Sequence, residues 1–309
     1  MTEVSSTKAW LMAARPQTLP AGASPVIVGT GLALQRDVFS PLPACMALLG
    51  ALLIQIGTNF ANDYYDAMKG ADTDDREGFT RVTQSGLIDP ESVKRAMYLT
   101  FVAAILVGVY LVYVGGAPIV VVGLSSIVAG ILYTGGPYPY GYRGLGDLFV
   151  FVFFGLVAVT GTYYVQAAAT LAAPLSLGLP EGTVPPIAVA ASLPAAGLST
   201  TILVVNNIRD RETDAATGKR TLAVMLGYRW SRVEFLAMMG LAYVVPIGFV
   251  LSGNSVVVLL PLLTAPLAVA LSSTVLTETS GPALNRALET TGKLLASHSV
   301  LFAVGLALA

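Results

Sequence analysis

Nine long apolar stretches alternate with shorter polar stretches along the 309 residues of the chain. A helix needs roughly 20 mostly apolar residues to cross a bilayer, and most of these stretches have about that length. The predicted spans are residues 17–35, 41–62, 95–114, 117–134, 147–170, 185–207, 229–251, 254–277 and 290–308. The pattern therefore predicts an all-α, polytopic membrane bundle of about nine transmembrane helices.

Three polar loops interrupt the apolar pattern, at residues 63–94, 135–146 and 208–228. If there are nine spans, all three loops lie on the same side of the membrane. The same side carries every lysine and arginine of the chain except Arg36. Because basic residues concentrate in cytoplasmic loops, we expect an inner or plasma membrane protein with a cytoplasmic N-terminus and the opposite location for the C-terminus.

Composition supports this class and excludes others. The chain is 55% hydrophobic and 11% charged, with a mean hydropathy of +0.73, which is far from the usage of soluble domains. A net charge of −1 gives no basic surface, so no nucleic-acid partner is expected. The single cysteine, Cys45, excludes an intrachain disulfide and a cysteine metal cluster. We expect one integral-membrane domain over residues 1–309.

The first polar loop begins with acidic residues at the end of the second predicted span. If that helix continues past Asn62, it places Gln55, Asn59 and Asp63 on one face. Asn62 and Asp66 lie on the same side, offset by one turn. Polar groups at membrane depth are costly unless they line a cavity, and they therefore indicate a functional site.

A second cluster, NNIRDRETDAATGKR, begins at Asn206 at the end of the sixth predicted span. Asn206, Asp210 and Asp214 follow one another at intervals of four, so one helical face presents an amide and two carboxylates. Lys219 and Arg220 come shortly afterwards. Since the two clusters are four spans apart, we expect a pseudo-repeat of spans one to four and five to eight, with the ninth span extra.

Carboxylates without histidine or cysteine partners suit hard divalent cations, and Mg²⁺ is typically held by a few carboxylates together with substrate phosphates. Lysine and arginine side chains beside these carboxylates would neutralise the remaining charge of a diphosphate. These residues are Lys69, Arg76, Arg81, Lys219 and Arg220. A neutralised diphosphate leaves readily, so the predicted chemistry is ionisation of an allylic carbon–oxygen bond in a dry apolar cavity.

Four stretches of the chain resemble the UbiA-type intramembrane prenyltransferases, whose hallmark is a pair of aspartate-rich motifs. They are ARPQTLPAGASPVIVG at 14–29, NFANDYYDAMKGADT at 59–73, YTGGPYPYGYRGLGD at 133–147 and NNIRDRETDAATGKRTLAVMLG at 206–227. The chain is most similar to the subgroup that prenylates 1,4-dihydroxy-2-naphthoate in menaquinone synthesis. The general pattern N-D-x-x-D-x-x-x-D has its third acid where this chain has Gly70, and Asp72 supplies it two residues later, as in that subgroup. Phe79 departs from the Gly-Pro that is usual there, which affects the role expected of Arg81.

The resemblance implies Mg²⁺-dependent transfer of a polyprenyl group from polyprenyl diphosphate to 1,4-dihydroxy-2-naphthoate, at the cytoplasmic side of the bilayer. Carbon dioxide and diphosphate are lost, and the product is demethylmenaquinone. The implied Mg²⁺ ligands are Asp63, Asp66, Asp72, Asp210 and Asp214. The implied substrate contacts are Asn59, Asn62 and Asn206 to ions or phosphates, Lys219 and Arg220 to the diphosphate, and Arg76 and Arg81 as helpers from a closing loop. The implied catalytic set is Asp63, Asp66, Asp210, Asp214, Lys219 and Arg220.

Several residues keep two interpretations. Arg15 either binds the naphthoate carboxylate or the diphosphate, or it anchors the first span at its basic end. Tyr133 either faces the prenyl cation through its ring or anchors the chain at the membrane interface. The FVFVFFG stretch from Phe149 either lines the prenyl tunnel or packs within the bundle or against lipid. His298, the only histidine, has no acid or cysteine near it in sequence and is assigned no role.

Two alternative functions remain at this point. Related prenyltransferases act on hydroxybenzoate, homogentisate, chlorophyllide, haem or glycerol phosphate. A cation-coupled transporter also has intramembrane acids and repeats, but transporter sites usually lie near the bilayer midplane on broken helices. Here both acidic clusters lie at helix ends and continue into basic loops, which favours the enzyme.

Overall fold

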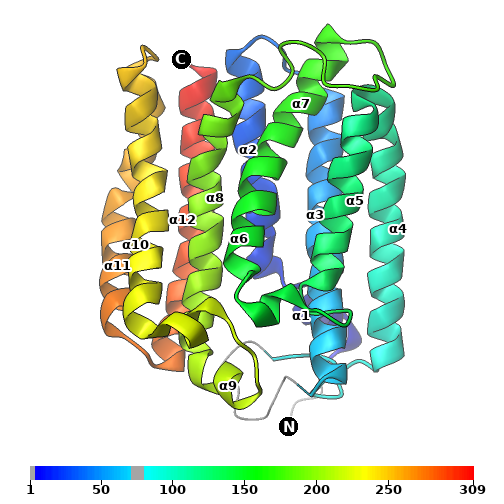
Figure 1. The fold of residues 1–309 in the computed structure, drawn as a ribbon, viewed down its shortest axis with the longest axis vertical. Helices are drawn as coiled ribbons and strands as arrows, with labels where there is room; N and C mark the ends of the chain where they lie inside the picture. The colour runs from blue at the N-terminus through cyan, green and yellow to red at the C-terminus, as the bar shows by residue number, and fades with distance from the viewer. Residues whose placement is uncertain (1–3, 71–79) are drawn as a thin grey trace.

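The computed structural model describes residues 4–70 and 80–309, and it forms a bundle of long helices (Figure 1). Helix α1 lies at one end of the bundle and the C-terminus at the other. Every regular element in the described residues is helical. The predicted all-α class is confirmed.

The elements are α1 (Ser6–Ala14), η1 (Pro16–Thr18), α2 (Leu19–Gln35), α3 (Pro41–Met68), α4 (Pro90–Gly115), α5 (Ala117–Leu132), η2 (Tyr140–Arg143), α6 (Gly146–Phe151), the π-helical η3 (Val152–Val157), α7 (Ala158–Leu171), α8 (Pro186–Arg209), α9 (Arg211–Ala216), α10 (Leu222–Leu251), η4 (Val256–Thr264), α11 (Ala265–Thr277) and α12 (Gly281–Ala307). Most of the elements follow one another closely along the chain, with longer connections between α3 and α4 and between α7 and α8.

Six helical segments are long and apolar enough to cross a membrane. They are Pro41–Met68, Pro90–Gly115, Gly146–Leu171, Pro186–Arg209, Leu222–Leu251 and Val256–Thr277. Helix α5 is also apolar but has only 16 residues. Helix α12 is long, but its first half carries Arg286, Glu289 and Lys293. The chain is a multi-pass membrane protein, whereas the count of nine spans and the pseudo-repeat stay predictions.

Prolines mark where several of these helices begin. Pro41, Pro90 and Pro186 each occupy the first turn of a helix, where proline costs no hydrogen bond and has a suitable φ. Asp89 also caps α4, because its carboxylate accepts a hydrogen bond from the backbone N–H of Ser92 at 3.0 Å. Local sequence therefore determines the starts of these helices.

Helix α8 is the most enclosed of the candidate spans and forms the centre of one half of the bundle. Its buried Leu198, Val205 and Ile208 belong to a core shared with Phe235 of α10 and Leu284 of α12. On another side, η3 comes so near that a Cβ added at Gly155 would lie 2.1 Å from the Cβ of Ala196. Helix α8 is thus closely packed on both of these sides.

Candidate functional site

A cavity of about 790 Å³ runs inside the bundle from the ends of α3 and α8. Its wall combines a charged end with a long apolar body. The charged residues that line it are Arg15, Asp66, Arg81, Asp210, Asp214 and Lys219, and we call this region the acidic end. Far from these residues in the fold, the lining includes Tyr113, Ile119 and Leu175, near the loop that joins α7 to α8. Such a shape suits a ligand with an anionic head and a long apolar tail.

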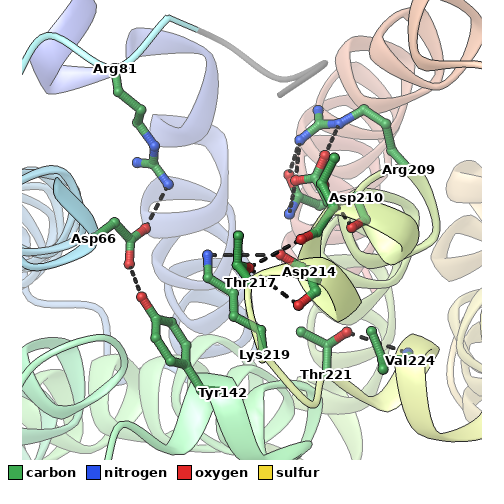
Figure 2. Close-up of polar contacts among 12 residues, drawn as sticks. Asp66, Arg81, Tyr142, Arg209, Asp210, Asp214, Thr217, Lys219, Thr221 and Val224 are labelled. Carbon is green, nitrogen blue, oxygen red and sulfur yellow. Dashed lines mark hydrogen bonds and ion pairs between the residues drawn. The ribbon is translucent and has the colours of Figure 1, made fainter. Parts of the chain in front are cut away.

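Asp66 of the first motif is held from two sides (Figure 2). Its Oδ2 pairs with Nη2 of Arg81 at 2.9 Å, and its Oδ1 accepts a hydrogen bond from the hydroxyl of Tyr142 at 2.5 Å. Arg81 comes from the segment that leads into α4, and Tyr142 comes from η2 between α5 and α6. Both ends of the carboxylate are therefore oriented before any ligand binds.

Asp63, one turn earlier on α3, is only 1% exposed. Its two oxygens accept hydrogen bonds from the backbone N–H groups of Val82 and Thr83, at 3.2 and 3.0 Å. Arg15 approaches its Oδ2 to 3.7 Å. Asp63 is not among the residues that line the cavity. In this structure it anchors the segment carrying Arg81 against α3.

Asp210 of the second motif is bound by its neighbour in sequence, Arg209 (Figure 2). The guanidinium of Arg209 donates from Nε to Oδ1 and from Nη2 to Oδ2 of Asp210, both at 2.7 Å. It also donates to Oδ1 of Asn206 and, from Nη1, to Oδ1 of Asn285 on α12, both at 2.8 Å. Arg209 thereby ties the end of α8 to α12 and fixes the Asp210 carboxylate.

Asp214 and Lys219 form the other side of this motif. Lys219 Nζ lies 3.8 Å from Oδ1 of Asp214 and 4.8 Å from the centre of the Tyr142 ring. In Figure 2 the side chain of Lys219 extends between Asp66 and Asp214. Arg220, in contrast, is exposed and outside the lining, although its backbone N–H donates to the carbonyl of Tyr142 at 2.9 Å.

The three predicted amides also line the cavity. Asn59 Nδ2 donates to the carbonyl of Ala14 and to Oγ1 of Thr18, both at 2.9 Å. Asn62 Oδ1 accepts from the hydroxyl of Thr134 at 3.1 Å. Their contacts reach η1 and the end of α5, so the amides hold neighbouring elements around the acids.

Lys69 lies at the end of α3 but not in the cavity wall. Its ammonium donates to the carbonyl oxygens of Thr134 and Gly136, at 2.5 and 3.3 Å. Burial lowers the pKa of Lys69, and the Asp66 carboxylate opposes this shift by raising it. Lys69 therefore fastens the loop after α5 to α3.

The described acids fit Mg²⁺ through the chemistry of their donors. Asp66 at the end of α3, Asp210 at the end of α8 and Asp214 in α9 line one cavity and supply only hard oxygen ligands. Within residues 4–70 and 80–309, no three acidic, histidine or cysteine side chains are close enough to enclose an ion. Because Mg²⁺ usually takes few protein carboxylates and completes its shell with phosphates and water, this arrangement suits an ion shared with a diphosphate.

A row of aromatic rings borders the cavity next to the acids. Tyr133 meets Tyr140 edge to face at 5.5 Å, Tyr140 stacks on Phe149 at 4.0 Å, and Phe149 stacks on Phe153 at 6.0 Å between ring centres. All four line the cavity. The hydroxyl of Tyr140 donates to the carbonyl of Ala129 at 2.8 Å, and burial raises its pKa above the usual value. This placement favours the cavity-lining interpretations of Tyr133 and the FVFVFFG stretch.

Some of the residues considered in the sequence analysis do not line the cavity, and some residues of the site were not predicted. Asp72 and Arg76 lie outside the described residues. His298 is buried against the carbonyl of Ala242, at 3.0 Å, and is absent from the cavity lining. Sequence reasoning counted Arg209 only as a basic loop residue and gave Tyr142 no role. The sequence did contain a signal for Arg209. In NNIRD the arginine falls on the buried side of α8 and directly precedes the motif aspartate, so a contact between the two could have been expected.

Comparison with known proteins agrees with the resemblance to prenyltransferases that the sequence motifs indicate. Residues 23–297 match the UbiA prenyltransferase family. The chain is 40% identical to the 1,4-dihydroxy-2-naphthoate octaprenyltransferase of Escherichia coli (strain K12), over 99% of this chain and 98% of that protein. It is 37% identical to the protein of the same name from Mycobacterium tuberculosis, over 94% of this chain and 93% of that protein.

Among solved structures, a UbiA homolog from Archaeoglobus fulgidus bound to DMAPP and Mg²⁺ has the same fold. It aligns with a TM-score of 0.60 at 16% identity and covers 96% of this chain and 99% of the other. The family match, the similarity to relatives over nearly the whole chain and the shared fold all agree. The chain belongs to the UbiA prenyltransferase family.

Proposed function

We propose that the protein transfers a polyprenyl group from polyprenyl diphosphate to 1,4-dihydroxy-2-naphthoate, with loss of carbon dioxide and diphosphate. One observation carries the proposal: the acids and bases of both motifs converge at one end of a cavity that is otherwise long and apolar. The names of the relatives from Escherichia coli and Mycobacterium tuberculosis support the choice of acceptor.

Asp66, Asp210 and Asp214 are proposed to hold Mg²⁺, with Asp63 and Asp72 assisting. Bound Mg²⁺ would neutralise the diphosphate and so stabilise it as a leaving group. Lys219 and Arg81 are placed to donate to the remaining phosphate oxygens, since both line the cavity beside the acids. Arg76 and Arg220 are proposed as weaker contributors, and Asn62 and Asn206 as groups that orient the phosphates.

The apolar body of the cavity would receive the prenyl chain and exclude water. The carbon–oxygen bond to diphosphate breaks, and a carbon–carbon bond forms at the ring carbon that bears the carboxylate. The carboxylate leaves as carbon dioxide and returns its bonding electrons to the ring. Because carbon dioxide leaves in place of a ring proton, the transfer needs no general base, and His298 is not among the residues that line the cavity.

The aromatic row has a defined part in this proposal. An allylic cation is attracted to the faces of aromatic rings, and a dry site strengthens that attraction. Tyr133 and Phe149 border the cavity close to the acids. Their rings would shelter the cation until the acceptor attacks.

We also propose that the chain is a single domain in a cell or plasma membrane, with its acidic end at the cytoplasmic side. Basic residues concentrate around that end, as the positive-inside rule requires. Membership of a prenyltransferase family favours the enzyme over the cation-coupled transporter.

The proposed function is tested by incubating membranes that contain the protein with labelled polyprenyl diphosphate and a panel of aromatic acceptors, with and without Mg²⁺. We expect a prenylated, decarboxylated product from 1,4-dihydroxy-2-naphthoate only when Mg²⁺ is present. Preferential prenylation of hydroxybenzoate, homogentisate or another acceptor would contradict the acceptor assignment. Full activity after removal of divalent ions would contradict the metal.

A further inference from the structure

The polar network between α1, η1 and α3 has one fixed reference point. The backbone carbonyl of Ala14 can only accept, so the group of Asn59 that contacts it at 2.9 Å must be the amide nitrogen Nδ2. This determines that Asn59 Oδ1 points towards Gln55. Gln55 must then present its own nitrogen, Nε2, which lies 3.4 Å from that oxygen.

Thr18 completes the network, and its hydroxyl group can form no further hydrogen bond. Its hydroxyl donates to the carbonyl of Arg15 at 2.9 Å and accepts from Asn59 Nδ2 at 2.9 Å and from Gln55 Nε2 at 3.1 Å. A hydroxyl has one proton and two lone pairs, so all of its hydrogen-bonding positions are used.

Gln55 Oε1 is the acceptor that remains in this network. It is shielded from solvent, and no group among the described residues donates to it. Leaving such an oxygen unsatisfied destabilises the folded protein. Gln55 is only 7% exposed and lines the cavity, as do Thr18 and Arg15. The site therefore calls for a ligand that carries a hydrogen-bond donor.

We propose that Gln55 Oε1 accepts a hydrogen bond from the 4-hydroxyl group of the aromatic acceptor, and so helps to select it. This inference rests on the proposed function. The prenyl chain has no donor, and a diphosphate offers only anionic acceptors, which a carbonyl oxygen repels. In 1,4-dihydroxy-2-naphthoate the 1-hydroxyl is adjacent to the carboxylate and bonds to it internally. The 4-hydroxyl is the donor that remains free.

Arg15 offers the aromatic acceptor a second contact, in which the protein side chain donates hydrogen bonds instead of accepting one. It lines the same cavity, and its backbone carbonyl is linked to Gln55 through the hydroxyl of Thr18. A guanidinium recognises a carboxylate, whereas a carbonyl oxygen recognises a hydroxyl. The pair would orient an aromatic ring that carries both groups.

The test compares equilibrium binding of 4-hydroxy-2-naphthoate and 2-naphthoate to the purified protein in lipid. The two probes differ only in the 4-hydroxyl. For the wild-type protein we expect the hydroxylated probe to bind about tenfold more tightly. In Gln55→Met, which keeps the side-chain length, we expect the two probes to bind equally. A ratio is insensitive to a general loss of affinity, because both probes occupy the same site.

Gln35→Met is the matched control. Gln35 also has a buried Oε1 without a donor among the described residues, but it lies at the far end of α2 and outside the cavity lining. This variant should keep the wild-type ratio.

Equal binding of the two probes to the wild-type protein would overturn the inference, even if Gln55→Met did not fold. A tenfold preference that persists in Gln55→Met would also overturn it. Failure of the proposed function has a different signature, namely that the wild-type protein does not prenylate 1,4-dihydroxy-2-naphthoate in the acceptor panel.

Discussion

Tyr142 donates its hydroxyl to Asp66 Oδ1 at 2.5 Å, across 76 positions of the sequence. The same residue accepts the backbone N–H of Arg220 through its carbonyl and places its ring 4.8 Å from Lys219 Nζ. Tyr142 therefore joins the two motifs, although it belongs to neither.

Tyr142→Phe should lower kcat by roughly 10- to 150-fold, because a hydrogen bond to a charged group contributes roughly 1.5–3 kcal/mol. The ring beside Lys219 remains, so the protein should stay folded. Tyr138→Phe is the matched control, since Tyr138 lies in the same loop but is 69% exposed. Steady-state kinetics of both variants in lipid would measure the difference, and an equal effect would refute a role for the Tyr142 hydroxyl.

Asp66→Asn and Asp210→Asn should each remove most activity while the protein remains folded and inserted. Each change removes a ligand charge but keeps the side-chain shape and an oxygen for the neighbouring arginine. Glu91→Gln, at an exposed acid outside the cavity lining, should have no effect. Turnover and melting temperature should be measured together. Near-normal turnover in both aspartate variants would exclude the two-motif metal site.

Lys219→Ala should weaken prenyl diphosphate binding by roughly 10- to 150-fold, because a charge-assisted contact contributes about 1.5–3 kcal/mol. The affinity for the aromatic acceptor should change little. Arg220→Ala should lose less, since Arg220 is exposed and outside the cavity lining. Kinetics with each substrate saturating in turn would separate these effects. Equal losses for donor and acceptor in both variants would indicate a general folding defect.

Gly123→Phe should reduce the use of long prenyl donors relative to geranyl diphosphate by about tenfold. Gly123 lies on α5 and lines the apolar body of the cavity, and a Cβ built there meets nothing within 4 Å. The added ring would occupy space that a long chain needs. Gly240→Phe, at an equally open position of α10 outside the lining, is the control. An unchanged preference for donor length would show that the chain follows another path.

A reporter fused after Glu181 should be extracytoplasmic, and one in the 208–228 loop should be cytoplasmic. The segment 171–185 contains no lysine or arginine, whereas 208–228 contains several. The two segments also lie at opposite ends of the bundle (Figure 1). The same location for both reporters would contradict the proposed orientation.

The sequence by itself determined the helical class, the position of most spans and the location of both acidic motifs. These features depend on local rules. A run of apolar residues must form a helix in lipid, and Pro41 and Pro186 mark where α3 and α8 begin. The i, i+4 spacing also brings Asp210 and Asp214 together, since the backbone N–H of Asp214 donates to the carbonyl of Asp210 at 2.7 Å. The predicted continuous helix is interrupted there, because α8 ends at Arg209 and α9 begins at Arg211.

Only the tertiary structure decided which distant groups complete each acid. Asp66 meets Tyr142, and Arg209 meets Asn285, each pair separated by 76 positions. It also decided that Lys219 enters the cavity wall while its neighbour Arg220 does not. Helical periodicity describes one helix at a time. The partner of a buried polar group depends instead on how several helices pack, so the periodicity of one helix cannot identify it.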